Sequence, residues 1–172
     1  ISLFYCFSNI SWSFGSMGQW ATINRPLVGG LVVGLILGNP VQGTIIGATI
    51  NVIYLGLVSA GGSLPADSGM AGIMGTTFAL IGGLDTNTAL ALAVPMGLVG
   101  AVIEVLTMTG QCMLIPLADK WIEQGKSKLV IWANTWIPYI VKSIIRFIIV
   151  FVILYFGSNA LDSVTNALSG RV

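Results

Sequence analysis

The hydrophobic positions of this chain form long runs that are separated by short breaks of glycine, proline and polar residues. The runs cover residues 27–38, 43–58, 69–84, 87–117 and 129–157. The first has only 12 residues, short of the roughly 20 that a helix needs to cross a bilayer, whereas the last is long enough. Short hydrophobic segments interrupted by Gly or Pro are typical of transporters with discontinuous helices. The pattern predicts an all-α polytopic membrane bundle with broken or re-entrant helices.

The breaks between the hydrophobic runs are rich in residues that start helices, and glycines recur at a regular spacing around them. Asn24-Arg25-Pro26 and Asn39-Pro40 fit helix starts, because proline is accepted in the first turn of a helix. Small residues spaced four apart let two helix backbones approach closely in lipid. We therefore predict tight helix packing around the glycines at this spacing, with direct ligand contact as the alternative; they are Gly30, Gly34, Gly38, Gly43 and Gly47.

Polarity divides the chain into five regions. They are an N-terminal interfacial segment (1–23) with Trp12 and Trp20, a glycine-rich membrane transport core (24–118), a loop (119–128), a membrane helix (129–157) and a polar tail (158–172). The loop carries three lysines, so the positive-inside rule places it in the cytoplasm. Within the core, the run 87–117 is either one long helix kinked at Pro95 or two shorter pieces.

Composition confirms the membrane class and excludes several functions. The chain is 55% hydrophobic and 8% charged, whereas about a quarter of residues are charged in soluble domains. The few basic residues form no patch for nucleic acid. With no histidine, the chain cannot be a phosphohistidine carrier or use an imidazole metal site, and we expect no metal or cofactor. Cys6 and Cys112 are expected to be free buried thiols.

Three acidic residues are the only charged residues between Pro26 and Ala118. An ionisable group at membrane depth costs roughly 2.5 to 3.5 kcal/mol on insertion scales, so each requires a reason. Asp85 lies in a Gly-Gly-Leu-Asp turn and is expected to cap a helix at a solvated loop. Glu104 lies inside a hydrophobic run, where pairing with Lys142 or Arg146 and a direct functional role both remain open.

Asp67 is the strongest candidate for chemistry. It ends the stretch Gly43–Asp67, in which a membrane helix passes into a glycine-rich turn. A carboxylate surrounded by hydroxyl, amide and open backbone groups suits a neutral polyol such as a sugar, and not an anion or a lone metal ion. The predicted substrate-binding residues are Asn51, Ser59, Gly61, Gly62, Ser63 and Asp67, and Asp67 is also a possible base toward a sugar hydroxyl. The alternatives are a helix cap at Asp67 and an interhelical hydrogen bond at Asn51.

At these residues the chain resembles the IIC subunit of mannose/fructose/sorbose-type sugar phosphotransferase systems. The resemblance covers residues 24–120 and is carried by the following stretches: Asn24 to Val28, LVVGLILGNPVQGTIIGATINVIYLGL, Gly61-Gly62 to Pro65-Ala66-Asp67, AGIMGTTFALIGG and ALALAVPMGLVG. In the family the aspartate of the Gly-Gly…Pro-x-Asp turn faces the sugar, which here is Asp67. The helix residue that is often Glu in relatives is Asn51 here. Family members usually continue with further spans, so the chain is expected to be shortened or divergent.

The resemblance implies a multi-pass protein of the bacterial inner membrane that acts as the sugar-translocating subunit, with an elevator-type core. It is not an enzyme alone. The implied partners are a sugar, membrane lipid, a homologous IID subunit in a larger hetero-oligomer, and cytoplasmic IIA and IIB proteins that pass phosphate to the sugar. The alternative is a scaffold, or a receptor to which bacteriocins dock, whose partner carries the sugar site.

Overall fold

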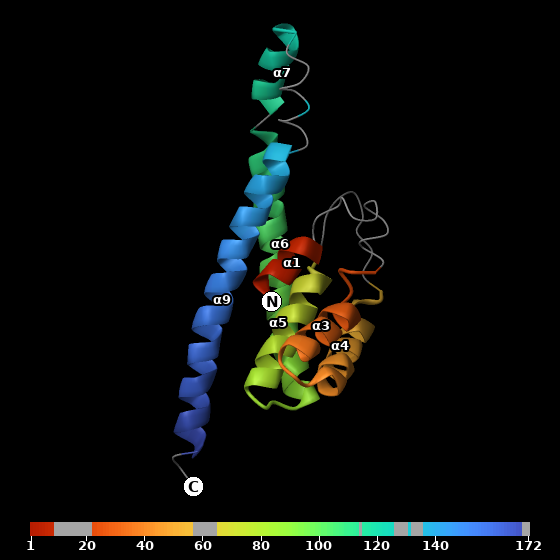
Figure 1. The fold of residues 1–172 in the computed structure, drawn as a ribbon, viewed down its shortest axis with the longest axis vertical. Helices are drawn as coiled ribbons and strands as arrows, with labels where there is room; N and C mark the ends of the chain where they lie inside the picture. The colour runs from red at the N-terminus through yellow and green to blue at the C-terminus, as the bar shows by residue number, and fades with distance from the viewer. Residues whose placement is uncertain (9–21, 57–64, 114, 126–130, 132–135, 170–172) are drawn as a thin grey trace.

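The computed structural model describes residues 1–8, 22–56, 65–113, 115–125, 131 and 136–169. Throughout these ranges the regular elements are helices, which confirms the all-α prediction (Figure 1). The helices are α1 (Ser2–Ser8), α3 (Pro26–Ile36), α4 (Pro40–Tyr54), α5 (Ser68–Ile81), α6 (Thr86–Cys112), α7 (Ile115–Glu123) and α9 (Ile137–Ser169).

Helices α3 and α4 form a tight hairpin. Each begins at a proline, and the turn between them places Gly38 at φ +79°, a conformation that glycine adopts without strain. The Asn39 side chain then accepts a hydrogen bond from the backbone amide of Gln42 at 3.4 Å and caps α4. The Asn39-Pro40 break is thus a reversal of direction between two short helices.

The two helices of this hairpin touch through backbone atoms. A Cβ added at Gly30 would lie 2.7 Å from the Cα of Gly47, and one added at Gly43 would lie 2.7 Å from the Cα of Gly34. Both distances are shorter than real side-chain contacts, so no other residue fits without separating the helices. The predicted close packing is therefore confirmed for these four glycines, whereas a Cβ at Gly38 would meet open space.

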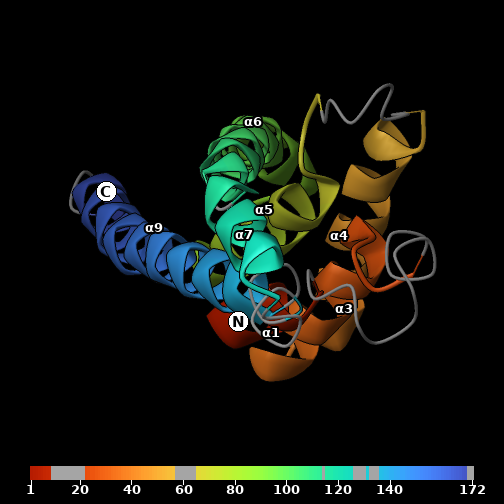
Figure 2. The ribbon, with the colours of Figure 1, turned by 90° about the horizontal axis from the view of Figure 1, so that it is seen from above.

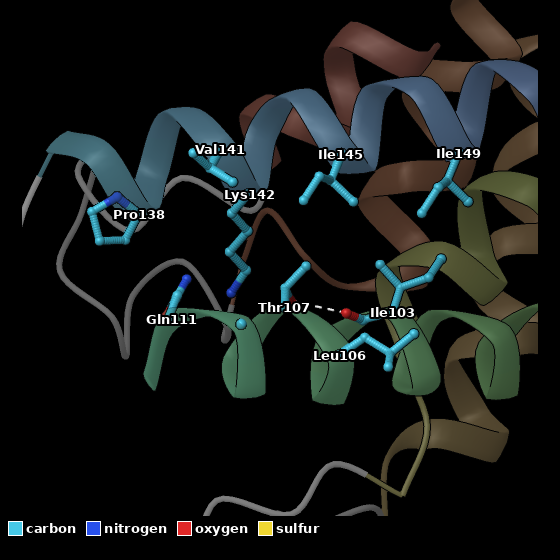
Figure 3. A pocket seen from close by; sticks show the side chains of 10 residues that line it. Ile103, Leu106, Thr107, Gln111, Pro138, Val141, Lys142, Ile145 and Ile149 are labelled. Atoms are coloured by element: carbon cyan, nitrogen blue, oxygen red, sulfur yellow. Dashed lines mark hydrogen bonds between the residues drawn. The ribbon is translucent and has the colours of Figure 1, made fainter. Parts of the chain in front are cut away.

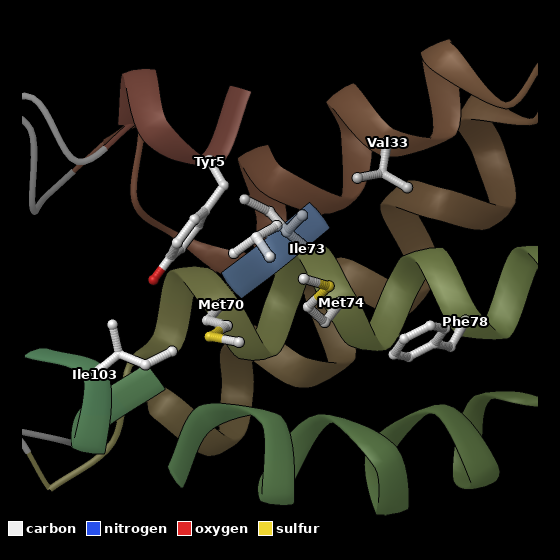
Figure 4. Close-up of a cluster of buried hydrophobic side chains, with 8 residues drawn as sticks. Tyr5, Val33, Met70, Ile73, Met74, Phe78 and Ile103 are labelled. Atoms are coloured by element: carbon white, nitrogen blue, oxygen red, sulfur yellow. The ribbon is translucent and has the colours of Figure 1, made fainter. Parts of the chain in front are cut away.

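Helix α5 is the centre of the molecule. All residues from Gly69 to Ala79 are buried, because α3 and α4 pack on one side of α5, and α1, α6 and α9 on the others (Figures 1 and 2). Its Met70, Ile73, Met74 and Phe78 form a hydrophobic cluster with Tyr5 of α1 (Figure 4). Small residues such as Gly72 and Gly75 leave room for Pro26 of α3 and Ala93 of α6.

Two helices are long and apolar enough to cross a membrane, Thr86–Cys112 and Ile137–Gly157. The run 87–117 is one long helix as far as Cys112, with Pro95 inside it. Helix α9 begins at Ile137 and continues through the predicted polar tail as far as Ser169. It runs beside α6 but is largely exposed, and its outward face carries stacked rings of Phe147, Phe151 and Tyr155.

Asp85 caps α6, as predicted. Its carboxylate accepts hydrogen bonds from the hydroxyl and the backbone amide of Thr88. These bonds, and above all the one from the Thr88 hydroxyl, stabilise the ionised carboxylate and lower the pKa of Asp85. The carboxylate therefore stabilises the fold fully above the ordinary pKa of aspartate, and this contribution is lost as the pH falls through the lowered value.

We expect this cap to give a small, measurable pH dependence. Asn also caps helices well but does not titrate. The melting temperature of wild-type protein should therefore fall more steeply than that of Asp85→Asn as the pH is lowered from about 5 to about 2, through and below the ordinary pKa of aspartate. Parallel melting curves for the two proteins across this range would show that the cap is not ionised in the way described.

Candidate functional site

Asp67 lies at the start of α5, buried to 5% exposure. Its Oδ1 accepts a hydrogen bond from the Met70 amide at 3.1 Å, so the alternative reading as a helix cap is confirmed. Its own backbone amide donates to the carbonyl oxygen of Gly97 on α6 at 2.9 Å. The position of the carboxylate is thus fixed by two helices at once.

The second carboxylate oxygen is also occupied. The hydroxyl of Tyr5 donates to Asp67 Oδ2 at 2.6 Å, and the Tyr5 side chain is only 1% exposed. Tyr5 comes from α1, 62 residues away in the sequence. Sequence reasoning missed this residue, because nothing in the N-terminal run distinguishes one aromatic side chain from the others around it.

Asn24 is a further polar neighbour that sequence reasoning did not assign to the site. It precedes α3 and is 7% exposed, and a Cβ added at Gly69 would clash with its amide oxygen. Within the described residues, this buried oxygen has no hydrogen-bond partner. Ser68 links the same two segments, because its hydroxyl donates to the Asn24 carbonyl at 3.5 Å. The starts of α3 and α5 therefore meet beside Asp67.

Asn51 lies near the end of α4 and is half-buried. Its side-chain oxygen is buried and makes no hydrogen bond to any described residue. Tyr54, on the next turn, packs beside Gly97, since a Cβ there would clash with the Tyr54 hydroxyl. Because Gly97 also binds the Asp67 backbone, the end of α4 and the start of α5 converge on one point of α6. The other predicted ligands, Ser59, Gly61, Gly62 and Ser63, lie outside the described residues.

Glu104 pairs with both candidate cations. Lys142 Nζ lies 2.7 Å from Glu104 Oε1, and Arg146 Nη2 pairs with Oε2. The side chains of Lys142 and Arg146 are 21% and 3% exposed, so this is a largely buried triad that joins α9 to α6. Of the two alternatives left open for Glu104, the pairing is confirmed, with both cations as partners in place of one.

The Glu104 triad and Asp67 are connected through Tyr5. The guanidinium carbon of Arg146 lies 5.9 Å from the centre of the Tyr5 ring, within the range of a cation–π contact. Tyr5 in turn donates to Asp67. Asp67, Tyr5, Arg146 and Glu104 therefore form a continuous buried chain of polar contacts across α5, α1, α9 and α6.

A groove lies beside this chain of contacts but does not include Asp67. It has a volume of about 240 Å³ between α6 and α9. Apolar side chains line most of it, and Gln111 and Lys142 lie toward the end nearer Pro138 (Figure 3). Asp67 and Tyr5 are both buried, so the described part of the candidate site is closed to solvent.

The chemistry of the site is that of hydrogen bonding. Around Asp67 the described residues offer a carboxylate, the Asn24 amide and the Tyr5 hydroxyl, which suit the hydroxyl groups of a neutral polyol. Among the described residues, no group of three or more His, Cys, Asp or Glu could hold a metal ion.

Comparison with known sequences identifies related proteins. A family model described as the sorbose-specific IIC component of the PTS system matches residues 1–172. The sorbose-specific EIIC component of Lacticaseibacillus casei is 31% identical over 134 residues, which are 78% of this chain and 48% of the relative. The mannose-specific EIIC component of Escherichia coli strain K12 is 27% identical over 90% of this chain and 58% of its own length. The chain spans about half the length of the curated relatives it matches.

Two solved structures have the same fold. A mannose transporter, ManYZ, determined by cryo-EM in complex with microcin E492, matches with a TM-score of 0.78 at 22% identity, over 99% of this chain and 68% of that one. A second structure, described as a membrane protein, matches with a TM-score of 0.76 at 24% identity, over 97% and 65%. The two structural matches show that the fold is shared. Because the family model matches residues 1–172, the chain belongs to the sorbose-specific IIC component family of sugar phosphotransferase systems.

Proposed function

We propose that this protein is the sugar-translocating membrane subunit of a phosphoenolpyruvate-dependent phosphotransferase system. The observation that carries the proposal is the position of Asp67. It is the one acid of the core that is neither exposed, as Asp85 is, nor paired with a cation, as Glu104 is, in the described structure. A buried carboxylate in an apolar core that forms no ion pair in the described structure requires a function.

In this proposal Asp67 accepts hydrogen bonds from sugar hydroxyls and helps to remove the proton from the hydroxyl that is phosphorylated. Asn51 supports the proposed sugar site, because its buried side-chain oxygen is an acceptor without a partner among the described residues. An unpaired buried acceptor costs about 1–3 kcal/mol, which a sugar hydroxyl would recover on binding. Ser59, Gly61, Gly62 and Ser63 complete the site in the stretch that precedes Asp67.

The proposal includes partners and a location. The subunit acts in the bacterial inner membrane with a IID subunit in a larger hetero-oligomer, and cytoplasmic IIA and IIB proteins supply the phosphate. The names of its relatives, which specify sorbose, mannose and N-acetylgalactosamine, suggest a hexose or hexosamine as substrate. Alternating access moves the core as an elevator. Two observations support membrane insertion: the two long apolar helices and the wide exposed apolar surface of α9.

We expect replacement of Asp67 to abolish sugar uptake. Asp67→Asn keeps the shape and still caps α5, but it cannot act as a base and binds hydroxyl groups more weakly, so uptake should fall at least 100-fold, corresponding to about 3 kcal/mol of lost charged hydrogen bonds. Uptake of labelled mannose, sorbose and N-acetylgalactosamine by cells that lack their own transporters measures this.

The matched control is Asp85→Asn, which makes the same change at another helix cap, outside the site. It should transport at the wild-type rate. Normal uptake by Asp67→Asn and Asp67→Ala at normal expression would contradict the assignment and favour the alternative, in which this subunit is a scaffold and its partner binds the sugar.

A further inference from the structure

We infer that the Tyr5 side chain occupies the place of the sugar, between the Asp67 carboxylate and the Arg146 guanidinium, and that both groups bind the sugar when α1 withdraws. This inference rests on the proposed function and adds two residues to it: Arg146 as a sugar ligand on α9, and Tyr5 as an internal competitor.

The first argument comes from the nitrogens of Arg146. Nη2 pairs with Glu104, but Nε and Nη1 are buried and have no hydrogen-bond partner among the described residues. The side chain is 3% exposed, and its guanidinium lies 5.9 Å from the centre of the Tyr5 ring. Leaving charged donors unsatisfied in a buried site is costly, so their retention indicates a ligand that uses them.

The second argument is that Tyr5 resembles what it would exclude. Its hydroxyl donates to Asp67 Oδ2 at 2.6 Å, as a sugar hydroxyl would. The phenol is a six-membered ring with a hydroxyl group, similar in size to a hexose ring. Exchange of one for the other preserves the hydrogen bond to the carboxylate. A sugar would also bring oxygen atoms that can accept hydrogen bonds from Arg146. The face of the Tyr5 ring offers Arg146 a cation–π contact but no such acceptor.

The third argument concerns which element can move. Asp67 is fixed by bonds of its backbone amide to Gly97 and of its side chain to Met70. Tyr5, by contrast, lies on α1, a separate helix that packs against α5 and α9 and contacts α9 through the Cys6 thiol, which donates to the Ser143 carbonyl at 3.5 Å. Withdrawal of α1 would therefore open the space between Asp67 and Arg146 while the carboxylate stays in place.

Equilibrium binding of labelled mannose, sorbose and N-acetylgalactosamine to the full-length protein, purified in the assembly that it forms in its own membrane, tests the inference. Tyr5→Phe removes the competing hydroxyl, so the sugar should bind about tenfold more tightly. Arg146→Lys keeps the charge for Glu104 but loses the planar fork of donors, so binding should weaken about tenfold or more. The control, Tyr139→Phe, makes the same chemical change at the exposed start of α9 and should bind as wild type.

Unchanged affinity in either Tyr5→Phe or Arg146→Lys, when Asp67→Asn has lost binding, overturns this inference and leaves the proposed function standing. Wild-type binding by Asp67→Asn would instead overturn the proposed function. If Tyr5→Phe fails to fold, a second measurement tests the inference: the rate at which the Cys6 thiol is alkylated, in a protein whose other cysteine of this chain is removed by Cys112→Ser. Saturating sugar should raise the rate of alkylation several-fold as α1 withdraws, and an unchanged rate overturns the inference.

Discussion

Replacement of Glu104 by Leu is expected to destabilise the protein by about 3–5 kcal/mol, the usual effect of removing one partner of a buried ion pair. The change leaves Arg146 and Lys142 without their anion, and Arg146 is almost completely buried. Among the described residues α9 packs only lightly on α6, so this joint is a large share of what holds the two helices together. The free energy of unfolding, measured by denaturant titration in mixed micelles, gives the size of the effect.

The matched variant replaces the whole triad by apolar residues: Glu104→Leu with Lys142→Met and Arg146→Met. Buried ion pairs replaced by apolar residues of similar volume are often neutral or stabilising, so this protein should recover most of the lost stability. A triple variant that is as unstable as Glu104→Leu alone would contradict the explanation by unpaired charge. The loss would then have to come from packing around Glu104.

Replacement of Gly30 by Ala is expected to destabilise the protein by about 3 kcal/mol, the upper end of what overpacking usually costs. The added methyl group would meet the backbone of Gly43 and Gly47, which cannot rotate away as a side chain can. Relief requires α3 and α4 to separate, and α3 also packs on α5. A fall in the melting temperature and loss of folded protein from the membrane are the measurements.

Gly110→Ala is the control for this change. Gly110 is also inside a helix, but a Cβ there would meet nothing within 4 Å, and alanine is the better helix former by about 1 kcal/mol. This variant should therefore be as stable as wild type or slightly more so. Equal effects of the two substitutions would show that the glycines act through helix propensity and not through the contact between backbones.

The sequence allowed the helices and their close packing to be predicted, because those features depend on local chemistry. Proline and asparagine mark the starts of α3 and α4, and the glycine spacing predicts the contact between them. The cap at Asp85 follows from the turn that precedes it. For Glu104, the cost of an isolated charge in a hydrophobic run made pairing with a cation one of two alternatives, the other being a functional role.

The surroundings of Asp67 could not be predicted in the same way. Tyr5 and Asp67 are 62 residues apart, and their contact depends on how α1 packs against α5 and α9. The sequence of α1 alone is compatible with a helix lying at the membrane surface. Only the assembled bundle shows that Tyr5 is buried and that Arg146 lies behind its ring.

The bond between the Asp67 amide and the Gly97 carbonyl also sets the depth of the carboxylate. Gly97 is 11 residues after Thr86, where α6 begins beside the exposed Asp85, and a helix rises 1.5 Å per residue. If α6 crosses a bilayer upright with its Asp85 end at the surface, Asp67 would lie roughly 17 Å inside, close to the middle of a hydrocarbon layer about 30 Å thick. At that depth a carboxylate must remain sealed from lipid at all times, and a polar substrate needs a hydrated path of about equal length to either side of the membrane.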